Sequence, residues 1–433
     1  MQYPFRAFVL LLVCASCVRI AQAGLPLDNA LDWDRDVLEP LDRPPMRRAL
    51  PPREGFETVP WGPGGDAPWL VPGGMPARLE SQLVSSLNTS GPLRWRAGVA
   101  WSDGPRPSWR LDGSMLALAL DRDELYASVE RRHWGPGWMG SLILDGAAPA
   151  LPAVGWRRTE AVPSTNPWLR WLGPWTADVF VGRLQGHSEP ARPFLIGTRL
   201  QFEPWPGLEL GLARTMQWGG AGRDEGWRSL IGGLIGRDNV GLGSTDQAHE
   251  PGNQLAGVDW RWTPQTPGLP SLYGQVAGED EAGLLPSRNM ALLGVDLPLH
   301  MRSGSLRVFL EAADTVAGDV SGRPAPGVAY RHHIYRQGYT HAGVPLGHPA
   351  GGDVRLVSVG ALLQHGALGA MAAISAGSVA PQAQRFQPGR VHALNMAAHL
   401  DATVRDRLGA GLWWLRDSAG PRGEAQLWWQ HRH

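Results

Sequence analysis

The 433-residue chain contains no lysine, only two cysteines and no excess of charge of either sign. All 40 basic residues are arginine, and 40 acidic residues balance them to a formal net charge of zero. A neutral chain without a basic stripe is not typical of a nucleic-acid-binding protein. A hydrophobic fraction of 43% is too high for a disordered one. We therefore expect a folded protein with no nucleic-acid partner.

The missing lysine also excludes one class of nucleotide site. A phosphate-binding P-loop needs a Gly-Lys-Ser/Thr sequence after its glycines. The glycine-rich run 231–236 has no such continuation. The run is better interpreted as a strand that bends or that another backbone approaches closely.

The scarcity of cysteine is explained by the N-terminus. Arg6 precedes an apolar stretch, and a small-x-small sequence ends at Ala23, which together predict a secretory signal peptide over residues 1–23. Both Cys14 and Cys17 lie inside this segment, so the mature chain is expected to form no disulfide. A lipoprotein acylated at Cys17 is the alternative, although Cys14 occupies the position where leucine is expected.

Long apolar runs are absent from the rest of the chain. No stretch after residue 24 approaches the roughly 20 apolar residues that a membrane-spanning helix needs. A helical membrane protein is therefore excluded. A membrane β-barrel is not, because its strands need only about 9 to 11 residues of alternating character.

The residues that are abundant favour β-structure. The chain has 56 Gly, 38 Pro and 21 Trp, and from about Leu93 onward its hydrophobicity alternates with period two. The run 194–203 is an example, with one mainly apolar face and an opposite face that includes Arg199 and Glu203. Side chains of a strand point alternately to its two sides, so each such run has one dry and one wetter face.

Three features favour lipid over a protein core as the neighbour of the dry faces. The wetter faces carry charges at mid-strand. A repeat of roughly 18 to 20 residues per strand and connection gives about 17 or 18 strands, as in large barrels. Tryptophans cluster near strand ends at 260–262, 413–414 and 428–429, where interfacial aromatic residues lie. A soluble propeller or sandwich stays open as the alternative, since the final lipid-facing position is His433 and not an aromatic residue.

The N-terminal region differs from the rest. Residues 24–93 are irregular and proline-rich, and Leu79, Leu83 and Leu87 at helical spacing predict a short helix over 76–87. We therefore expect a helical cap or plug over 24–93 and a membrane β-barrel over 94–433.

Charged residues of the strands allow two interpretations. The acidic residues could hold the carboxylate pair of a glycosidase, or they could pair with interior arginines across neighbouring strands. We favour the second interpretation and expect no enzyme; the residues concerned are the acidic Glu279, Asp280, Glu281, Asp259 and Glu311 and the basic Arg199, Arg261 and Arg307.

The histidines do not predict a metal site. Adjacent histidines on a strand face apart, and none of the 13 histidines has the close paired spacing of a zinc site. The group that we considered comprises His332, His333, His341 and His348. We expect these histidines to lie in loops or in the interior, and we expect no metal and no cofactor.

Several motifs in one order resemble the Wzi-type capsule assembly proteins. They cover about residues 130–350 and are Arg131-Arg132-His133-Trp134-Gly135-Pro136-Gly137, Leu195-Ile196-Gly197-Thr198-Arg199-Leu200, Gly236-Arg237-Asp238-Asn239, Asp259-Trp260-Arg261-Trp262, Leu272-Tyr273-Gly274-Gln275, Phe309-Leu310-Glu311-Ala312-Ala313-Asp314-Thr315, Tyr335-Arg336-Gln337-Gly338-Tyr339 and Leu346-Gly347-His348. The resemblance implies an all-β outer-membrane barrel of about 18 strands with a small N-terminal helical element at the periplasmic end. It implies a lectin-like scaffold that attaches capsular or related polysaccharide, not an enzyme.

Two segments contain the mixture of residues that binds sugars. Aromatic rings cover the apolar side of a pyranose, and the planar fork of arginine fits a uronic-acid carboxylate. The candidate polysaccharide-binding residues are Arg131, Arg132, His133, Trp134 and Trp138 in one segment and Asp259, Arg261 and Trp262 in the other. Tryptophans at strand ends are also ordinary interface anchors in any barrel, so this second interpretation stays open.

Two functions remain at this point. The first is a monomeric outer-membrane protein that binds capsular or extracellular polysaccharide and is surrounded by outer-membrane lipid. The second is a porin or solute channel, which rests on the barrel pattern alone. A filled interior favours the first function, and an open one favours the second.

Overall fold

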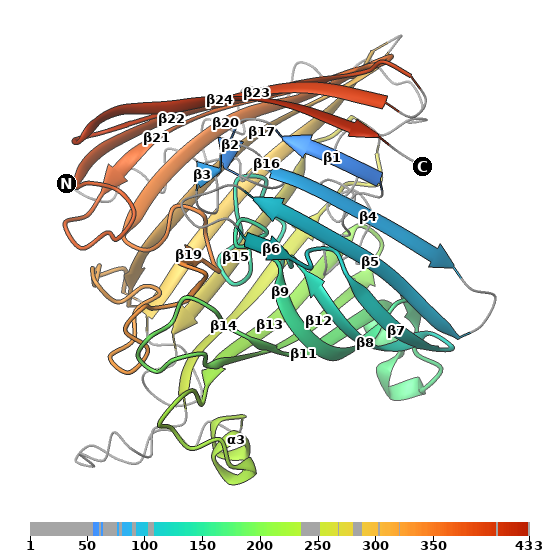
Figure 1. Ribbon diagram of the computed structural model, residues 1–433, viewed down its shortest axis with the longest axis vertical. Helices are drawn as coiled ribbons and strands as arrows, with labels where there is room; N and C mark the ends of the chain where they lie inside the picture. The colour runs from blue at the N-terminus through green and yellow to red at the C-terminus, as the bar shows by residue number, and fades with distance from the viewer. Residues whose placement is uncertain are drawn as a thin grey trace.

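The computed structural model describes an all-β chain with few helices. Among the residues that the structure describes, twenty strands belong to one sheet, and all of their residue pairings are antiparallel (Figure 1). Before residue 92 only four strands are described, and after it the structure describes residues 92–431 except 103–107, 235–251, 267, 280–287, 302–303, 320 and 404–405.

The first ten strands of the main sheet are β1 (Gly55–Val59), β4 (Glu80–Asn88), β5 (Leu93–Ser102), β6 (Ser108–Arg110), β7 (Met115–Leu120), β8 (Asp123–Glu130), β9 (Leu151–Arg158), β10 (Val162–Pro163), β11 (Pro174–Arg183) and β12 (Phe194–Trp205). The other ten are β13 (Leu208–Trp218), β14 (Gly252–Trp262), β15 (Ser271–Glu279), β16 (Arg288–Met301), β17 (Gly304–Gly318), β20 (Val354–His365), β21 (Leu368–Val379), β22 (Gly389–Asp401), β23 (Asp406–Asp417) and β24 (Gly420–His431). Smaller elements are the pair β2 (Gly62–Pro63) and β3 (Pro76–Ala77), the pair β18 (Thr340–His341) and β19 (Val344–Pro345), the 3-10 helix η2 (Pro167–Leu172) and the helix α3 (Trp227–Leu234).

Strand order in the sheet follows the chain closely. Each strand from β11 to β17 pairs with the next, β17 pairs with β20, and the series continues to β24. Strand β1 pairs with β24 on one side and with β4 on the other. The first and last strands are therefore neighbours, and the sheet curves around loop segments on its inner side (Figure 1).

Residues 80–88 form strand β4, where the leucine spacing predicted a helix over 76–87. A spacing of four residues is even, so it places residues on one face of a strand as well as on one face of a helix. Pairing with β1 and β5 selects the strand. The main sheet thus begins upstream of residue 94, the predicted start of the barrel. Most of the predicted plug, and all of the signal peptide over 1–23, lie outside the described residues.

The alternation of faces predicted from the sequence is confirmed. Outward-facing residues such as Val154, Ile374 and Leu427 are 58%, 59% and 61% exposed. Inward-facing residues such as Arg199 and Glu311 are only 3% and 1% exposed. Large apolar side chains thus cover the outside and charged ones the inside, which is the reverse of a water-soluble protein and is typical of a membrane barrel.

The predicted pairing of inward charges is confirmed for Arg199, Arg261 and Arg307, but only the Arg307 pair joins neighbouring strands, because the other two pairs each skip one strand. Arg199 forms a bidentate pair with Asp259, with both nitrogen–oxygen distances at 2.8 Å. Asp296 accepts from Arg261 at 2.7 Å and from Arg307 at 2.6 Å. These inward charges are therefore compensated by one another.

The two ends of the sheet differ in their connections. Hairpins β12–β13, β16–β17 and β20–β21 turn within two residues at one edge, here called the short-turn end. The opposite edge, here called the long-loop end, bears the connections 131–150 and 319–353. Short turns on one side and long loops on the other are the usual asymmetry of outer-membrane barrels.

Exposed tryptophans lie at both ends of the sheet, and four of them are at the short-turn end. Trp168 and Trp171 of η2 are 87% and 63% exposed, and Trp205 and Trp262, at the ends of their strands, are 66% and 44% exposed. Such positions are typical of an interfacial belt. Of the clusters predicted to form it, Trp262 lies at a strand end, whereas Trp413 and Trp414 lie within β23. The side chains of the pair 428–429 lie outside the described residues. No helix in the described part of the chain is long and apolar enough to cross a membrane.

A charge placed on the outer face tests which solvent surrounds it. Ile374 lies in the middle of β21 and faces outward. We expect Ile374→Arg to lower the free energy of unfolding in phospholipid bilayers by about 2–4 kcal/mol, because the guanidinium would enter hydrocarbon. Gln382→Arg, in an exposed loop, is the control and should change it by less than about 0.5 kcal/mol. Equal small effects of both substitutions would show that water covers β21.

Candidate functional site

The connection between β8 and β9, residues 131–150, folds back against the inner face of the sheet and is here called the inner loop. Trp134, Leu142 and Ile143 in it are completely buried. Its tight turns depend on glycine: a Cβ at Gly137 would lie 2.1 Å from the carbonyl oxygen of Gly140. The glycines therefore allow a bulky aromatic segment to pack as a compact insert.

Gln275 of β15 holds the first turn of the inner loop. Its Nε2 donates to the carbonyl oxygen of Trp134 at 2.7 Å, and its Oε1 accepts from the backbone N–H of Leu142 at 2.6 Å. The Trp134 ring packs edge-on against Phe180 of β11, with centroids 5.5 Å apart. One amide side chain thus satisfies two buried backbone groups that the turn would otherwise leave unpaired.

Trp138 joins the inner loop to strands β16 and β17 of the wall. Its backbone N–H donates to Glu311 Oε2 at 2.7 Å, and its indole N–H donates to Asp296 Oδ2 at 3.1 Å. The indole also stacks on Phe309, with centroids 5.8 Å apart and 17° between the planes. Glu311 accepts a second backbone N–H, from Met139, at 3.1 Å. Strands β16 and β17 therefore bind the tip of the loop through two carboxylates.

The basic residues of the inner loop contact other residues of that loop and the adjacent strand β11. The Arg132 guanidinium lies 4.2 Å from the ring centroid of Phe180 and is 5% exposed. His133 Nδ1 lies 3.3 Å from Asp145 Oδ2, and Arg131 donates to the carbonyl oxygen of Gly146 at 3.4 Å.

The second predicted group, on β14, is divided between the two faces of the sheet. Asp259 and Arg261 point inward, whereas Trp262 is on the outer face. Arg261 and Trp138 both donate to Asp296 Oδ2, so this carboxylate joins the two predicted groups. Seven of the eight candidate residues therefore lie at the inner side of the wall, and Trp262 does not.

A second connection, residues 319–353, packs on the inner loop and is here called the long loop. Tyr330 donates its hydroxyl to the carbonyl oxygen of Leu142 at 2.8 Å, and its backbone N–H donates to Glu279. The Tyr339 hydroxyl lies 2.7 Å from Thr215 Oγ1 on β13. The long loop therefore seals the inner loop from the long-loop end.

Sequence reasoning missed the residues that anchor these loops. Gln275, Tyr330 and Asp296 were not among the candidates, and Glu311 was considered only as a member of an acidic group. Gln275 and Asp296 had one signal, a polar side chain on the inward face of an alternating strand. Tyr330 had none, because an irregular loop has no period. Of the acidic group, Asp280 and Glu281 lie outside the described residues.

The exposed side of the loops is rich in arginine, although Arg336 pairs with the exposed Glu189 at 3.0 Å. Residues 321–337 and 382–390 contain no Asp or Glu but contain Arg323, Arg331, Arg336, Arg385 and Arg390. The two segments touch, since Arg331 donates to the carbonyl oxygen of Gln382. Burial and the nearby Arg422 lower the pKa of Arg385 to about 10. We call these two segments the basic loop surface.

Two histidines of the long loop are buried in their neutral form. Burial lowers the pKa of His341 and of His348 to about 4, from an ordinary value of 6.5. The Nδ1 of His341 accepts from the N–H of Gln185, and the Nδ1 of His348 accepts from the N–H of Ala350, both at 3.2 Å. Nearby groups are His187 and Asp112 at His341, and Asp145 at His348.

These histidines predict a long loop that loosens in acid. Above pH 6.5 both histidines are neutral whether the long loop is packed or opened. Between pH 6.5 and 4 they gain protons only when the loop is opened, so the packed loop becomes less stable as the pH decreases. The loss reaches at most about 3 kcal/mol per histidine. Amide hydrogen exchange of residues 338–348 should therefore lose protection between pH 7 and 4.5, and less so after replacement of both histidines, His341→Gln and His348→Gln. Equal protection at both pH values, after correction for intrinsic rates, would contradict this account.

Comparisons with known proteins agree on one family. The model of the family described as "Capsule assembly protein Wzi" matches residues 78–365. An "uncharacterized 55.8 kDa protein in cps region" of Klebsiella pneumoniae is 41% identical over 184 residues, which are 42% of this chain and 36% of that protein. The matched part thus spans only about a third of that relative.

A solved structure agrees over most of the chain. It is Wzi of Escherichia coli, described as an outer membrane protein involved in group 1 capsule assembly and as a carbohydrate-binding β-barrel. It superposes with a TM-score of 0.73 at 28% identity and covers 88% of this chain and 85% of that one. With a family match over more than half of its length and a fold shared almost throughout, this chain belongs to the Wzi family of capsule assembly proteins.

Proposed function

We propose that this protein is an outer-membrane β-barrel that binds acidic polysaccharide at its outer loops during capsule assembly and catalyses no reaction. The observation that carries the proposal is the basic loop surface, which lies over an interior filled by the protein's own loops. The arginines are thus displayed at a surface and not along a channel.

Closure into an 18-stranded barrel is part of this proposal. It is supported by a continuous ring of pairings through β1, β4, β5, β7, β8, β9, β11–β17 and β20–β24, which returns to β1. A closed barrel leaves no unpaired strand edge in lipid. A helical periplasmic element within residues 24–93 stays a prediction.

The orientation follows from the two ends of the sheet. Outer-membrane barrels have short periplasmic turns and longer extracellular loops. The long-loop end, and the basic loop surface with it, then faces outward, where capsular polysaccharide lies. Signal-peptide cleavage near Ala23 and a monomeric state complete the proposal as predictions.

The filled interior argues against the porin alternative. A general porin needs a continuous aqueous channel. Here Trp134, Trp138 and Tyr330 are at most 3% exposed. The two tryptophans form hydrogen bonds with the wall, and Tyr330 forms one with the inner loop. Such packing serves a scaffold, because it fixes loops that must present a binding surface.

The basic loop surface has the chemistry for an acidic glycan. Arginine forks bind carboxylates in a bidentate manner, and exposed glutamines such as Gln382 and Gln384 offer hydrogen bonds to hydroxyls. The carbohydrate binding named for E. coli Wzi supports the ligand class. Direct sugar contact by the eight candidate residues stays a prediction. The burial of Arg132, Trp134 and Trp138 favours a supporting role, in which they hold the loops.

Retention of polysaccharide by cells tests the proposal. Cells that lack the gene should release polysaccharide that the wild type keeps on its surface, and the chain length of the glycan should not change. Complementation with the double variant Arg323→Gln/Arg390→Gln should restore less cell-bound material. Its affinity for acidic oligosaccharide should fall roughly two- to thirtyfold, since exposed ion pairs contribute about 0.2–1 kcal/mol each.

The control is Arg122→Gln, which removes a half-exposed arginine, paired with Glu160, in the turn between β7 and β8 at the opposite end of the barrel. It should complement like the wild type. An unchanged ratio of bound to released polysaccharide in the deletion strain would contradict the function. A normal double variant in a strain that does respond to deletion would contradict only the assignment of the site.

A further inference from the structure

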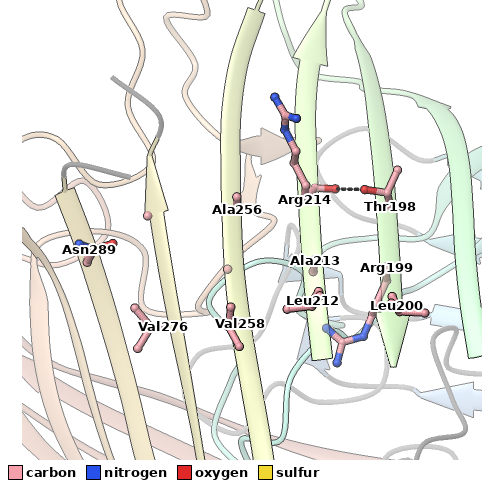
Figure 2. A pocket seen from close by; sticks show the side chains of 12 residues that line it. Thr198, Arg199, Leu200, Leu212, Ala213, Arg214, Ala256, Val258, Val276 and Asn289 are labelled. Atoms are coloured by element: carbon pink, nitrogen blue, oxygen red, sulfur yellow. Dashed lines mark hydrogen bonds between the residues drawn. The ribbon is translucent and has the colours of Figure 1, made fainter. Parts of the chain in front are cut away.

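The outer face of strands β12 to β16 is not uniformly apolar. An open groove of about 520 Å³ runs across it and bears an arginine among aliphatic residues (Figure 2). The outward side chains that line it belong to Thr198, Leu200, Leu212, Arg214, Ala256, Val258, Val276 and Asn289.

Strand register arranges this groove as two parallel rows. Thr198 pairs with Arg214, which pairs with Ala256, and the same row continues through Gly278 to Asn289. The row next to it, two residues nearer the short-turn end, is apolar throughout; it contains Leu200, Leu212, Val258 and Val276. The small residues Ala256 and Gly278 leave the space between Arg214 and Asn289 open.

The arginine side chain lies along the wall. Its backbone oxygen accepts from Thr198 Oγ1 at 3.4 Å, and its guanidinium donates to Gln254 Oε1 on the neighbouring strand. In Figure 2 the side chain extends away from Leu212, so that the cation and the aliphatic residues occupy opposite sides of the groove. The groove therefore has one polar and one apolar side.

Helix α3 marks the depth of the groove in the membrane. It packs on the outer face of β12 and β13, where Leu230 contacts a cluster that contains Met216, and Trp218 Nε1 donates to Ser229 Oγ at 3.1 Å. On α3, Trp227 and Ile231 are 67% and 46% exposed. A short helix with exposed Trp and Ile on the outer wall is typical of the headgroup region.

The row that contains Arg214 lies next to the helix, on the side toward the short-turn end. An outward arginine costs about 2–4 kcal/mol at the bilayer midplane but only about 0–1 kcal/mol near the interface. A cation at this depth meets lipid phosphates, for which a guanidinium is well suited. The row of Leu212, Val258 and Val276, which are 44%, 48% and 48% exposed, then offers an acyl chain its contact.

We propose that this groove is a binding site for one anionic lipid of the outer leaflet, whose phosphate contacts Arg214 and Asn289 and whose acyl chain follows the apolar row. The occupant is a lipid and not a free anion, because the apolar row adjoins the charge and continues the membrane-facing surface. The site rests on the outer-membrane placement but is separate from the basic loop surface.

Native mass spectrometry of the purified full-length protein, delipidated in detergent, tests the proposal. The probes are phosphatidylglycerol and zwitterionic phosphatidylcholine with identical acyl chains. Phosphatidylglycerol should form one saturable adduct, and Arg214→Gln should weaken it about tenfold, the value of one charge-assisted hydrogen bond. Gly278→Leu, which fills the groove without removing charge, should weaken it as well.

The matched control is Arg355→Gln. Arg355 also faces outward near the long-loop end, but it pairs with Asp314 at 3.0 Å and lies outside the groove. It should leave the adduct unchanged, and heat-sensitive electrophoretic mobility should confirm that every variant is folded. Equal adducts with both lipids, equal losses in both arginine variants, or displacement of the lipid by millimolar inorganic phosphate would each overturn the proposal.

Discussion

One buried carboxylate, Asp296, links the wall of this protein to the loop that fills it. It is 1% exposed and accepts from Arg261 and Arg307 of the wall and from the indole of Trp138 in the inner loop. A buried charge is tolerated only when it is paired and hydrogen-bonded. The two arginines meet that requirement, and the third bond fixes the position of Trp138. Neighbouring Glu311 adds two backbone N–H bonds to the same loop tip.

This arrangement explains why an inside-out sheet does not enclose an open pore. Charges on the inner face would suit a water-filled channel, but here they form ion pairs with each other and hydrogen bonds with the loop backbone. The inner loop supplies the aromatic residues that occupy the remaining space, and the long loop covers it through Tyr330 and Tyr339. The charged groups that can meet a ligand therefore lie on the basic loop surface, whose two segments contain several arginines and no acidic residue.

The sequence was most informative where the chain is periodic. Alternation correctly assigned the inward Arg199 and the outward Leu200, because a strand has only two faces. The same rule places Asp259 and Trp262 on opposite faces, but it was not applied to them, and both were grouped as sugar ligands. Leu79, Leu83 and Leu87 misled because their even spacing suits a helix and a strand equally. The fold of residues 131–150 could not be predicted, since it depends on Gln275, Asp296 and Glu311, which are 130 or more residues distant in the chain.

Conductance in planar bilayers tests the central claim, a barrel filled by its inner loop, most directly. The intact mature protein should show no large, steady single-channel current, because Trp134 and Trp138 occupy the interior. Replacement of residues 134–144 by a short Gly-Ser linker should raise the current, since it removes both rings and their anchors. A matched linker in place of residues 382–388, which belong to an exposed loop, should not. Large, steady currents from the intact protein would contradict the account.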